Sequence, residues 1–108
     1  KVALVSKADK GSIKSRYFMP WTCHNGYAIT GSICLMAASK SRETICSEFY
    51  SDYSENGMFE IEHPTGISKI NFEIEYKDNE INNLIAGTTR HARLLMSGDV
   101  YIQKSKLK

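Results

Sequence analysis

The sequence predicts an α+β fold in which a curved, mostly antiparallel sheet wraps around one central buried helix. Three observations lead to this prediction. Residues 27–39 are apolar or small on nearly every face of a helix, which indicates burial on all sides. Residues 69–76, "KINFEIEY", alternate apolar and polar side chains as a half-buried strand does. Most of the remaining chain consists of short strand-like and turn-like segments, which can cover the helix.

The first half of the chain contains the predicted helix and two predicted strands. The opening "KVALVS" is typical of a strand. The helix is expected over residues 27–39, and Lys40 and Arg42 place positive charge at its C-terminal end, where the helix dipole favours cations. We expect a strand over residues 43–51, "ETICSEFYS".

The second half is predicted to be strand and turn. Residues 59–62 form a short strand that ends in the Pro64-Thr65-Gly66 turn. Residues 83–96 are expected to be strand because Thr88 and Thr89 favour that conformation. The "SGD" at residues 97–99 predicts a hairpin turn before a strand "VYIQ".

Composition indicates one globular unit and limits the function classes. The 108 residues are 42% hydrophobic with a formal charge of +2. No apolar run reaches the ~20 residues that cross a bilayer, so a cytoplasmic protein without membrane contact is expected. A near-neutral chain is a poor nucleic-acid binder, and the basic tail of Lys104, Lys106 and Lys108 is expected to be a solvated end. Because the chain starts at Lys1 inside a strand, we expect it to be a piece of a longer protein.

The cysteines and histidines do not predict a metal site or a disulfide. Three cysteines with wide gaps indicate reduced thiols, and we expect Cys34 and Cys46 to be small core residues. Close Cys-x-x-Cys pairs are absent from the sequence, and its histidines, His24, His63 and His91, lack metal-ligand spacing. The sequence therefore predicts no metal site.

The stretch "WTCHNG" directly before the predicted helix is the candidate functional site. The free N–H groups of a helix start attract carboxylates and phosphates, and Gly26 would let an anion approach the backbone closely. His24 and Asn25 stand beside it as candidate binding residues. Alternatively, Asn25 or Thr22 is an ordinary N-cap, and His24 simply bonds the backbone.

Cys23 is a candidate proton donor and acceptor at the same place. A helix N-terminus and a neighbouring imidazole both stabilise a thiolate. The alternative is a packed cysteine without a chemical role.

Three segments resemble the C-terminal part of the PrpF-type isomerases, which have the diaminopimelate-epimerase-like fold. They are "HNGYAITGSIC" (24–34), "IEHPTG" (61–66) and "RHARLLMSGDVYI" (90–102), in the family's order. The chain departs from the family pattern at Asn25, where a basic residue is usual, at Gly26, where alanine is common, and at His91, where threonine is usual. The "MPWTC" before His24 also differs from the family's shorter approach.

The resemblance implies a two-domain isomerase of which this chain is most of the C-terminal domain. Family members such as aconitate-, methylitaconate- and oxalomesaconate-type isomerases shift a double bond in a small unsaturated di- or tricarboxylate without a cofactor. The resemblance places the acid/base lysine and cysteine in the missing N-terminal domain. It makes His24, Asn25 and Gly26 the substrate-binding half, with Cys23 near the place where epimerases of this fold keep a second cysteine.

Two other functions remain open on the sequence. The chain could be a non-catalytic unit of the same fold that binds a carboxylate or pairs with another chain, including a second copy in a homo-oligomer. More distantly, it could belong to a racemase or epimerase in which Cys23 is one thiol of a pair. The sequence that precedes Lys1 would distinguish these alternatives.

Overall fold

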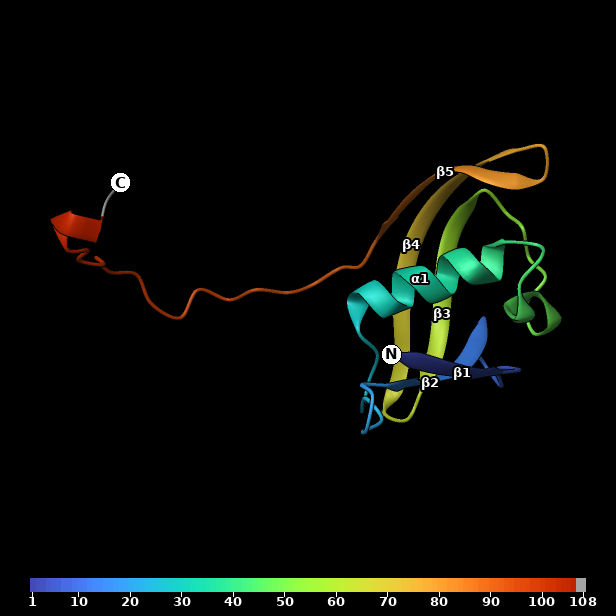
Figure 1. Cartoon of the computed structure of the whole chain (residues 1–108), viewed down its shortest axis with the longest axis horizontal. Helices are drawn as coiled ribbons and strands as arrows, with labels where there is room; N and C mark the ends of the chain where they lie inside the picture. Colours follow the sequence, from blue (N-terminus) through green and yellow to red (C-terminus); the bar gives the residue numbers. More distant parts are fainter. Residues whose placement is uncertain (107–108) are drawn as a thin grey trace.

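The computed structural model describes residues 1–106, which form one five-stranded sheet with a single α-helix lying against it (Figure 1). The elements in chain order are β1 (Val2–Ser6), β2 (Ile13–Phe18), α1 (Ile29–Lys40), the 3₁₀ helix η1 (Ile45–Glu48), β3 (Asn56–His63), β4 (Gly66–Lys77), β5 (Glu80–Gly87) and the 3₁₀ turn η2 (Lys104–Lys106). The strands lie in sequence order, antiparallel except for the β2–β3 pair. The α+β class and the mostly antiparallel sheet are therefore confirmed.

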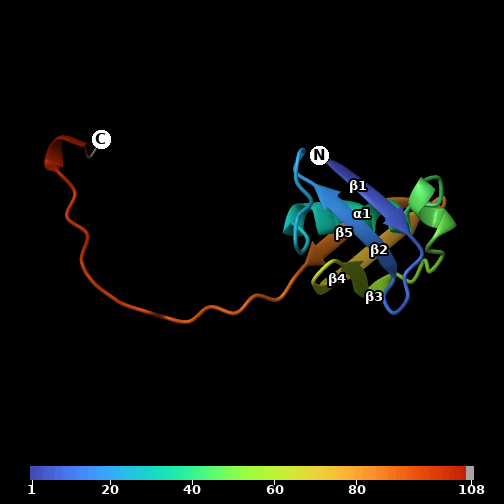
Figure 2. The same ribbon diagram turned by 90° about the horizontal axis from the view of Figure 1, so that it is seen from below.

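The sheet curves around α1, with β1 and β2 on one side of the helix and β4 and β5 on the other (Figures 1 and 2). The alternation predicted for β4 is confirmed, because its apolar side chains are buried and the polar ones between them are exposed. The core is formed by Ile13, Tyr17, Tyr27, Leu35, Met36, Cys46, Phe59, Ile61, Ile70, Phe72 and Ile74.

The connections follow from local chain geometry. Parallel strands cannot be joined by a tight turn, so α1 and η1 form the crossover from β2 to β3. The predicted turn joins β3 to β4, and Gly66 has a φ of 150° that favours glycine. Asp78 and Asn79 have φ values of 53° and 66°, as a two-residue hairpin loop between β4 and β5 requires.

The helix is confirmed, but the prediction that it is buried on every side is wrong. Ile29, Thr30 and Cys34 are exposed, so one face of α1 lies open. The reason is that the sheet formed by residues 1–106 wraps around only part of the helix and leaves the face with these three residues uncovered. Lys40 lies in the last turn of α1, as predicted, and its side chain is fully buried.

The strand predicted over residues 43–51 is also wrong, because the chain forms η1 there. Local side-chain bonds favour the tight turn over an extended strand. Thr44 Oγ1 donates to Ala38 O at 2.6 Å, and Ser47 Oγ donates to Thr44 O at 2.6 Å. Cys46 is buried as expected, although in η1 rather than in a strand.

The chain after Gly87 leaves the sheet and runs as an extended tail (Figure 1). The strand predicted through residue 96 therefore ends at Gly87, and the hairpin predicted with "VYIQ" is wrong, because the described residues offer this segment no partner strand. Lys104 and Lys106 are exposed, as expected, and Lys108 lies outside the described residues. In residues 1–106 no helix is long and apolar enough to cross a membrane.

Candidate functional site

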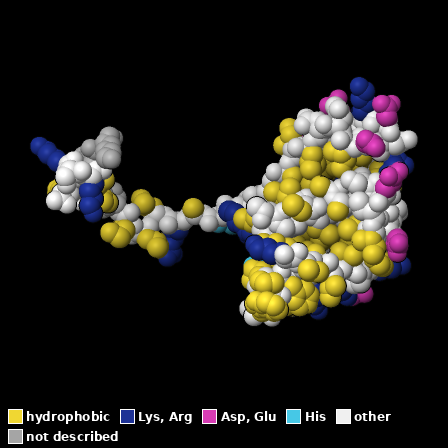
Figure 3. Space-filling view, in the orientation of Figure 1, with side chains coloured by type: hydrophobic (Ala, Val, Ile, Leu, Met, Phe, Trp, Pro, Cys, Tyr) yellow, Lys and Arg dark blue, Asp and Glu magenta, His cyan; other side chains and the backbone are white. Residues whose placement is uncertain are grey.

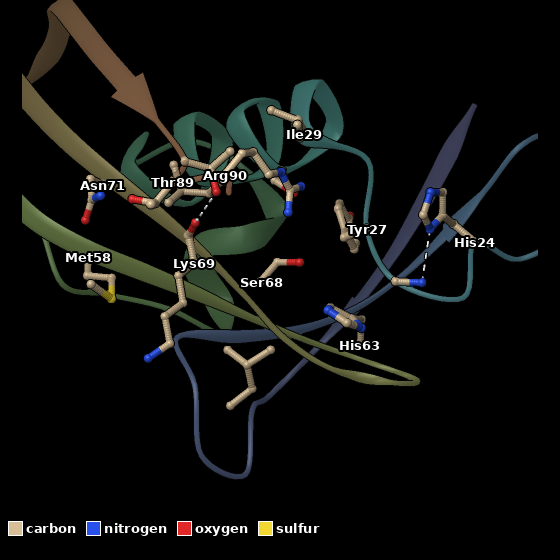
Figure 4. A pocket seen from close by; sticks show the side chains of 15 residues that line it. His24, Tyr27, Ile29, Met58, His63, Ser68, Lys69, Asn71, Thr89 and Arg90 are labelled. Atoms are coloured by element: carbon tan, nitrogen blue, oxygen red, sulfur yellow. Dashed lines mark hydrogen bonds between the residues drawn. The ribbon is translucent and has the colours of Figure 1, made fainter. Parts of the chain in front are cut away.

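A cleft of about 520 Å³ lies where the start of α1, the β3–β4 hairpin and the chain after β5 meet (Figure 4). Residues from segments far apart in sequence face it, including two of the three predicted binding residues, His24 and Gly26. The full lining is His24, Gly26, Tyr27, Ile29, Ser32, Met58, His63, Ile67, Ser68, Lys69, Ile70, Asn71, Thr88, Thr89 and Arg90.

His24 is held at the end of β2 by its backbone. Its N–H donates to Tyr17 O at 2.7 Å, and the preceding residue, Cys23, forms an isolated antiparallel bridge with Phe18. The His24 ring accepts a hydrogen bond at Nδ1 from the Gly26 N–H, at 3.0 Å. In the neutral ring the proton therefore lies on Nε2, which is available as a donor.

Thr65 ties the β3–β4 turn to the loop before α1. Its hydroxyl donates to Asn25 O at 2.8 Å, joining residues 40 positions apart in the sequence. Its backbone N–H donates to His63 Nδ1 at 3.4 Å, so the neutral His63 ring also carries its proton on Nε2. This one residue brings the two imidazoles to the same end of the cleft.

The pKa of His63 is lowered from its ordinary value. Burial is the largest cause, followed by the positive charges that His24 and Arg16 can carry nearby. His63 is therefore neutral at pH 7 in the free cleft, and an anion placed beside it would favour its protonation.

Gly26 lies between the two histidine rings. A Cβ added there would lie 3.7 Å from His63 Cε1 and 3.9 Å from His24 Cε1. Those distances are ordinary contacts, so a methyl group fits, but a larger side chain would fill the space between the rings.

The N-terminal end of α1 borders the cleft without a side-chain cap. The N-cap is Ala28, so neither Asn25 nor Thr22 is the cap that the alternative interpretation required. Ser32 lies in the first turn, and its hydroxyl donates back to Ala28 O at 2.9 Å. The free N–H groups of this turn carry the positive end of the helix dipole.

Arg90 adds a full positive charge. Thr88 Oγ1 donates to Lys69 O at 3.0 Å, which holds the chain after β5 against β4. Figure 4 shows the Arg90 guanidinium directed into the cleft on the same side as Ser68. Lys69 is paired with Glu60 at 3.1 Å. No aspartate or glutamate is among the described residues lining the cleft, so its charge favours an anion.

Two predicted site residues are not among those that line the cleft. Asn25 contributes its backbone carbonyl to Thr65, and its side chain is exposed. Cys23 is half-buried, and its thiol donates to His24 O at 3.6 Å. The catalytic role considered for Cys23 stays a prediction.

Sequence reasoning missed His63, Thr65 and Arg90 as site residues. Their signal was present, since His63 and Thr65 lie in "IEHPTG" and Arg90 opens "RHAR", two of the segments that carry the family resemblance. The resemblance predicts the fold, whereas the positions of these side chains depend on how the three segments meet in space.

In residues 1–106 no group of three or more histidine, cysteine, aspartate or glutamate side chains is placed to hold a metal ion. His91 lies on the extended tail and is exposed.

A curved sheet around a helix whose N-terminal end opens into a cationic cleft defines a domain suited to bind a small anion. Comparison with known proteins then gives the family. The model of the PrpF protein family matches residues 2–103, so the chain belongs to that family.

Named relatives agree with this assignment. The chain is 36% identical over 108 residues to the Escherichia coli K12 protein named "Putative isomerase YbhH", covering 94% of this chain and 29% of that protein. It is 29% identical over 99 residues to 3-methylitaconate isomerase of Eubacterium barkeri, covering 92% and 25%. A crystal structure of methylitaconate-delta-isomerase matches with a TM-score of 0.69 at 25% identity, over 96% of this chain and 30% of that one. The chain thus spans less than a third of the length of these relatives.

Proposed function

We propose that the complete protein is an isomerase that shifts a carbon–carbon double bond in a small unsaturated di- or tricarboxylate. In this proposal the chain is most of the C-terminal domain of a two-domain cytoplasmic protein, and its cleft is one wall of the substrate site. The observation that carries the proposal is the cleft itself, which combines an uncapped helix start, two histidines and Arg90 with no carboxylate in its described lining.

The cleft would act first by binding. The Arg90 guanidinium can pair with one substrate carboxylate in a two-pronged manner, and the N–H groups at the start of α1 can receive another. His24 and Gly26 form the edge between them, with Asn25 holding the loop through its carbonyl. The second domain would supply the opposite wall and exclude water, which strengthens these interactions.

The cleft would also stabilise the charge that develops during the reaction. A base removes a proton from a carbon adjacent to a carboxylate, the electron pair spreads over the allyl system and that carboxylate, and a proton returns at the far end. Donors that are already in place, such as the Nε2–H of His24 and Arg90, favour this anion over the substrate. The acid and base are proposed to be a lysine and a cysteine of the missing domain, and no cofactor enters the reaction.

The test measures binding and proton transfer in the complete protein with itaconate- and aconitate-type acids in deuterated water. We expect deuterium to enter the substrate and the double bond to move. Arg90→Gln should weaken binding by about 2 kcal/mol, roughly 30-fold in Kd, because one charged hydrogen-bonding partner is lost.

The matched control is Arg93→Gln, which removes an equal charge from an exposed position of the tail outside the cleft. Equal losses in the two variants would contradict the site assignment. Tight binding without deuterium exchange would instead favour a non-catalytic carboxylate-binding protein.

A further inference from the structure

The bend between β2 and α1 contains an Asn-Gly pair, Asn25-Gly26. The Asn25 side chain is exposed. Asparagine is thermally labile, and most so before glycine. The backbone nitrogen of the following residue can attack the asparagine side-chain carbonyl, and a glycine has no Cβ to obstruct that approach. The Asn-Gly sequence and the exposure of Asn25 make it a candidate, and the hydrogen bonds around it strengthen the case.

The peptide group that joins Asn25 to Gly26 is hydrogen-bonded at both ends. Its carbonyl oxygen accepts from Thr65 Oγ1 at 2.8 Å, and its N–H donates to His24 Nδ1 at 3.0 Å. Hydrogen bonds in such a chain polarise one another, which makes the N–H more acidic. The lone pair on His24 Nδ1 is a base that already contacts the Gly26 N–H proton. That proton must leave before the Gly26 nitrogen can attack.

We propose that Asn25 is a self-modification site, at which His24 promotes deamidation. The Gly26 nitrogen gives its proton to His24 Nδ1 and bonds to the Asn25 side-chain carbon, and ammonia leaves with the returned proton. The resulting five-membered succinimide is then opened by water, which yields aspartate or isoaspartate at position 25. Water is the sole co-reactant, and no electron donor or acceptor is required.

The modification would place a negative charge on the residue between His24 and Gly26, both of which line the cleft. Isoaspartate would also lengthen the backbone between His24 and Gly26 and disturb their hydrogen bond. Both effects oppose the binding of a carboxylate, so the modified protein should bind substrate more weakly. This consequence rests on the proposed function, whereas the deamidation itself does not.

The chain contains an internal control in its second Asn-Gly pair, Asn56-Gly57. Asn56 is also exposed, but it lies in β3 and pairs with Glu73 of β4. Gly57 faces the Phe72 ring rather than an imidazole, with a Cβ position 3.5 Å from that ring. The two sites share the same reacting pair and differ in structure.

The experiment incubates the complete protein at neutral pH and measures isoaspartate and aspartate at both sites by peptide mass spectrometry. We expect product to accumulate at least tenfold faster at Asn25 than at Asn56. In urea, where both pairs are unfolded, the two rates should become similar. Equal native rates, or a native ratio that persists in urea, would overturn the proposal.

Variants separate the role of His24 from loop exposure. His24→Ala should slow the reaction at Asn25 and leave Asn56 unchanged, and an unchanged rate at Asn25 would contradict the base role. Itaconate binding is then compared before and after incubation. Deamidation without a change in affinity would leave the modification standing and contradict the carboxylate site.

Discussion

The Nζ atom of Lys40 lies 4.2 Å from the centre of the Phe72 ring, inside the protein rather than in solvent. The ammonium donates to Asp52 O at 2.9 Å and to Ser54 Oγ at 3.0 Å. Burial lowers the pKa of Lys40, and the nearby charge of Asp52 opposes that shift. A cation at the end of α1 thus ties the chain before β3 to the core through hydrogen bonds and an aromatic face.

Lys40→Met should destabilise the fold, although methionine has a similar length and is apolar. It leaves the acceptors of Asp52 and Ser54 without their donor, which costs about 1–3 kcal/mol in the free energy of unfolding. Urea denaturation measures the loss. Lys77→Met, at an exposed position of β4, is the matched control and should change stability little. A Lys40 variant as stable as the control would show that the buried ammonium is dispensable.

Gly31→Ala should destabilise the protein, against the usual rule for helices. Alanine in a helix is normally favoured over glycine by about 1 kcal/mol. Here the added Cβ would lie 2.8 Å from Tyr17 Cε2, closer than two carbons can pack. We expect a net loss of about 1–3 kcal/mol in thermal or urea unfolding, because the buried Tyr17 ring must move. Thr30→Ala, one residue earlier on the exposed face, should instead be neutral or slightly stabilising.

Ligand binding should strengthen as the pH falls below neutrality. Because the pKa of His63 is lowered in the free protein, a bound dicarboxylate that raises it must draw a proton from solution. The other groups near this ring or in the cleft that can carry a positive charge are His24, Arg16, Lys69 and Arg90. Calorimetry in buffers of different ionisation enthalpy should show proton uptake on binding near pH 7.

His63→Gln should abolish that proton uptake, and His91→Gln on the exposed tail should not. Folding has the opposite pH dependence. The unfolded chain, in which His63 regains its ordinary pKa, binds the proton first, so this group lowers the stability of the free protein as the pH falls below about 6.5. Proton uptake that survives in His63→Gln would assign it to another group.

Thr65→Val should weaken ligand binding by about 1 kcal/mol, roughly fivefold in Kd, because the Asn25 loop loses its hydrogen-bond donor. Thr65→Ser keeps the hydroxyl and should behave like the original protein. The nitrogen chemical shifts of His63 provide a second measurement, since the backbone N–H of residue 65 remains and the ring should keep its tautomer in both variants. Equal affinities for valine and serine variants would show that the loop needs no anchor.

The sequence predicted those parts of the fold whose signals are local. The apolar run placed α1 within two residues at its start and one at its end, and strict alternation placed β4. β2 was missed because Ser15 interrupts the apolar alternation between Ile13 and Tyr17. Ser15 is nevertheless buried, and its hydroxyl donates to Leu4 O at 2.8 Å. In the sequence Ser15 is a polar residue at a position where the alternation requires an apolar one. The pattern therefore does not indicate a strand, although the hydrogen bond to Leu4 allows Ser15 to be buried.

The candidate site was predictable only in part for the same reason. His24 and Gly26 stand next to the helix start, so proximity in sequence identified them. His63 and Arg90 reach the cleft through the β3–β4 turn and the chain after β5, and their positions depend on long-range bonds such as Thr65 to Asn25 and Thr88 to Lys69. Such contacts leave no periodic pattern in a single sequence.

The open face of α1 gives the protein a built-in chemical reporter. Cys34 is exposed on that face, and Cys46 is only 4% exposed. Figure 3 shows how much apolar surface lies around the helix and along the tail. A thiol-alkylating reagent would therefore label Cys34 at a rate set by how far the face is uncovered, with Cys46 as an unreactive reference. Comparing that rate in the 108-residue chain and in a protein that includes the proposed N-terminal domain would show whether that domain covers the helix, without any substrate or assay of turnover.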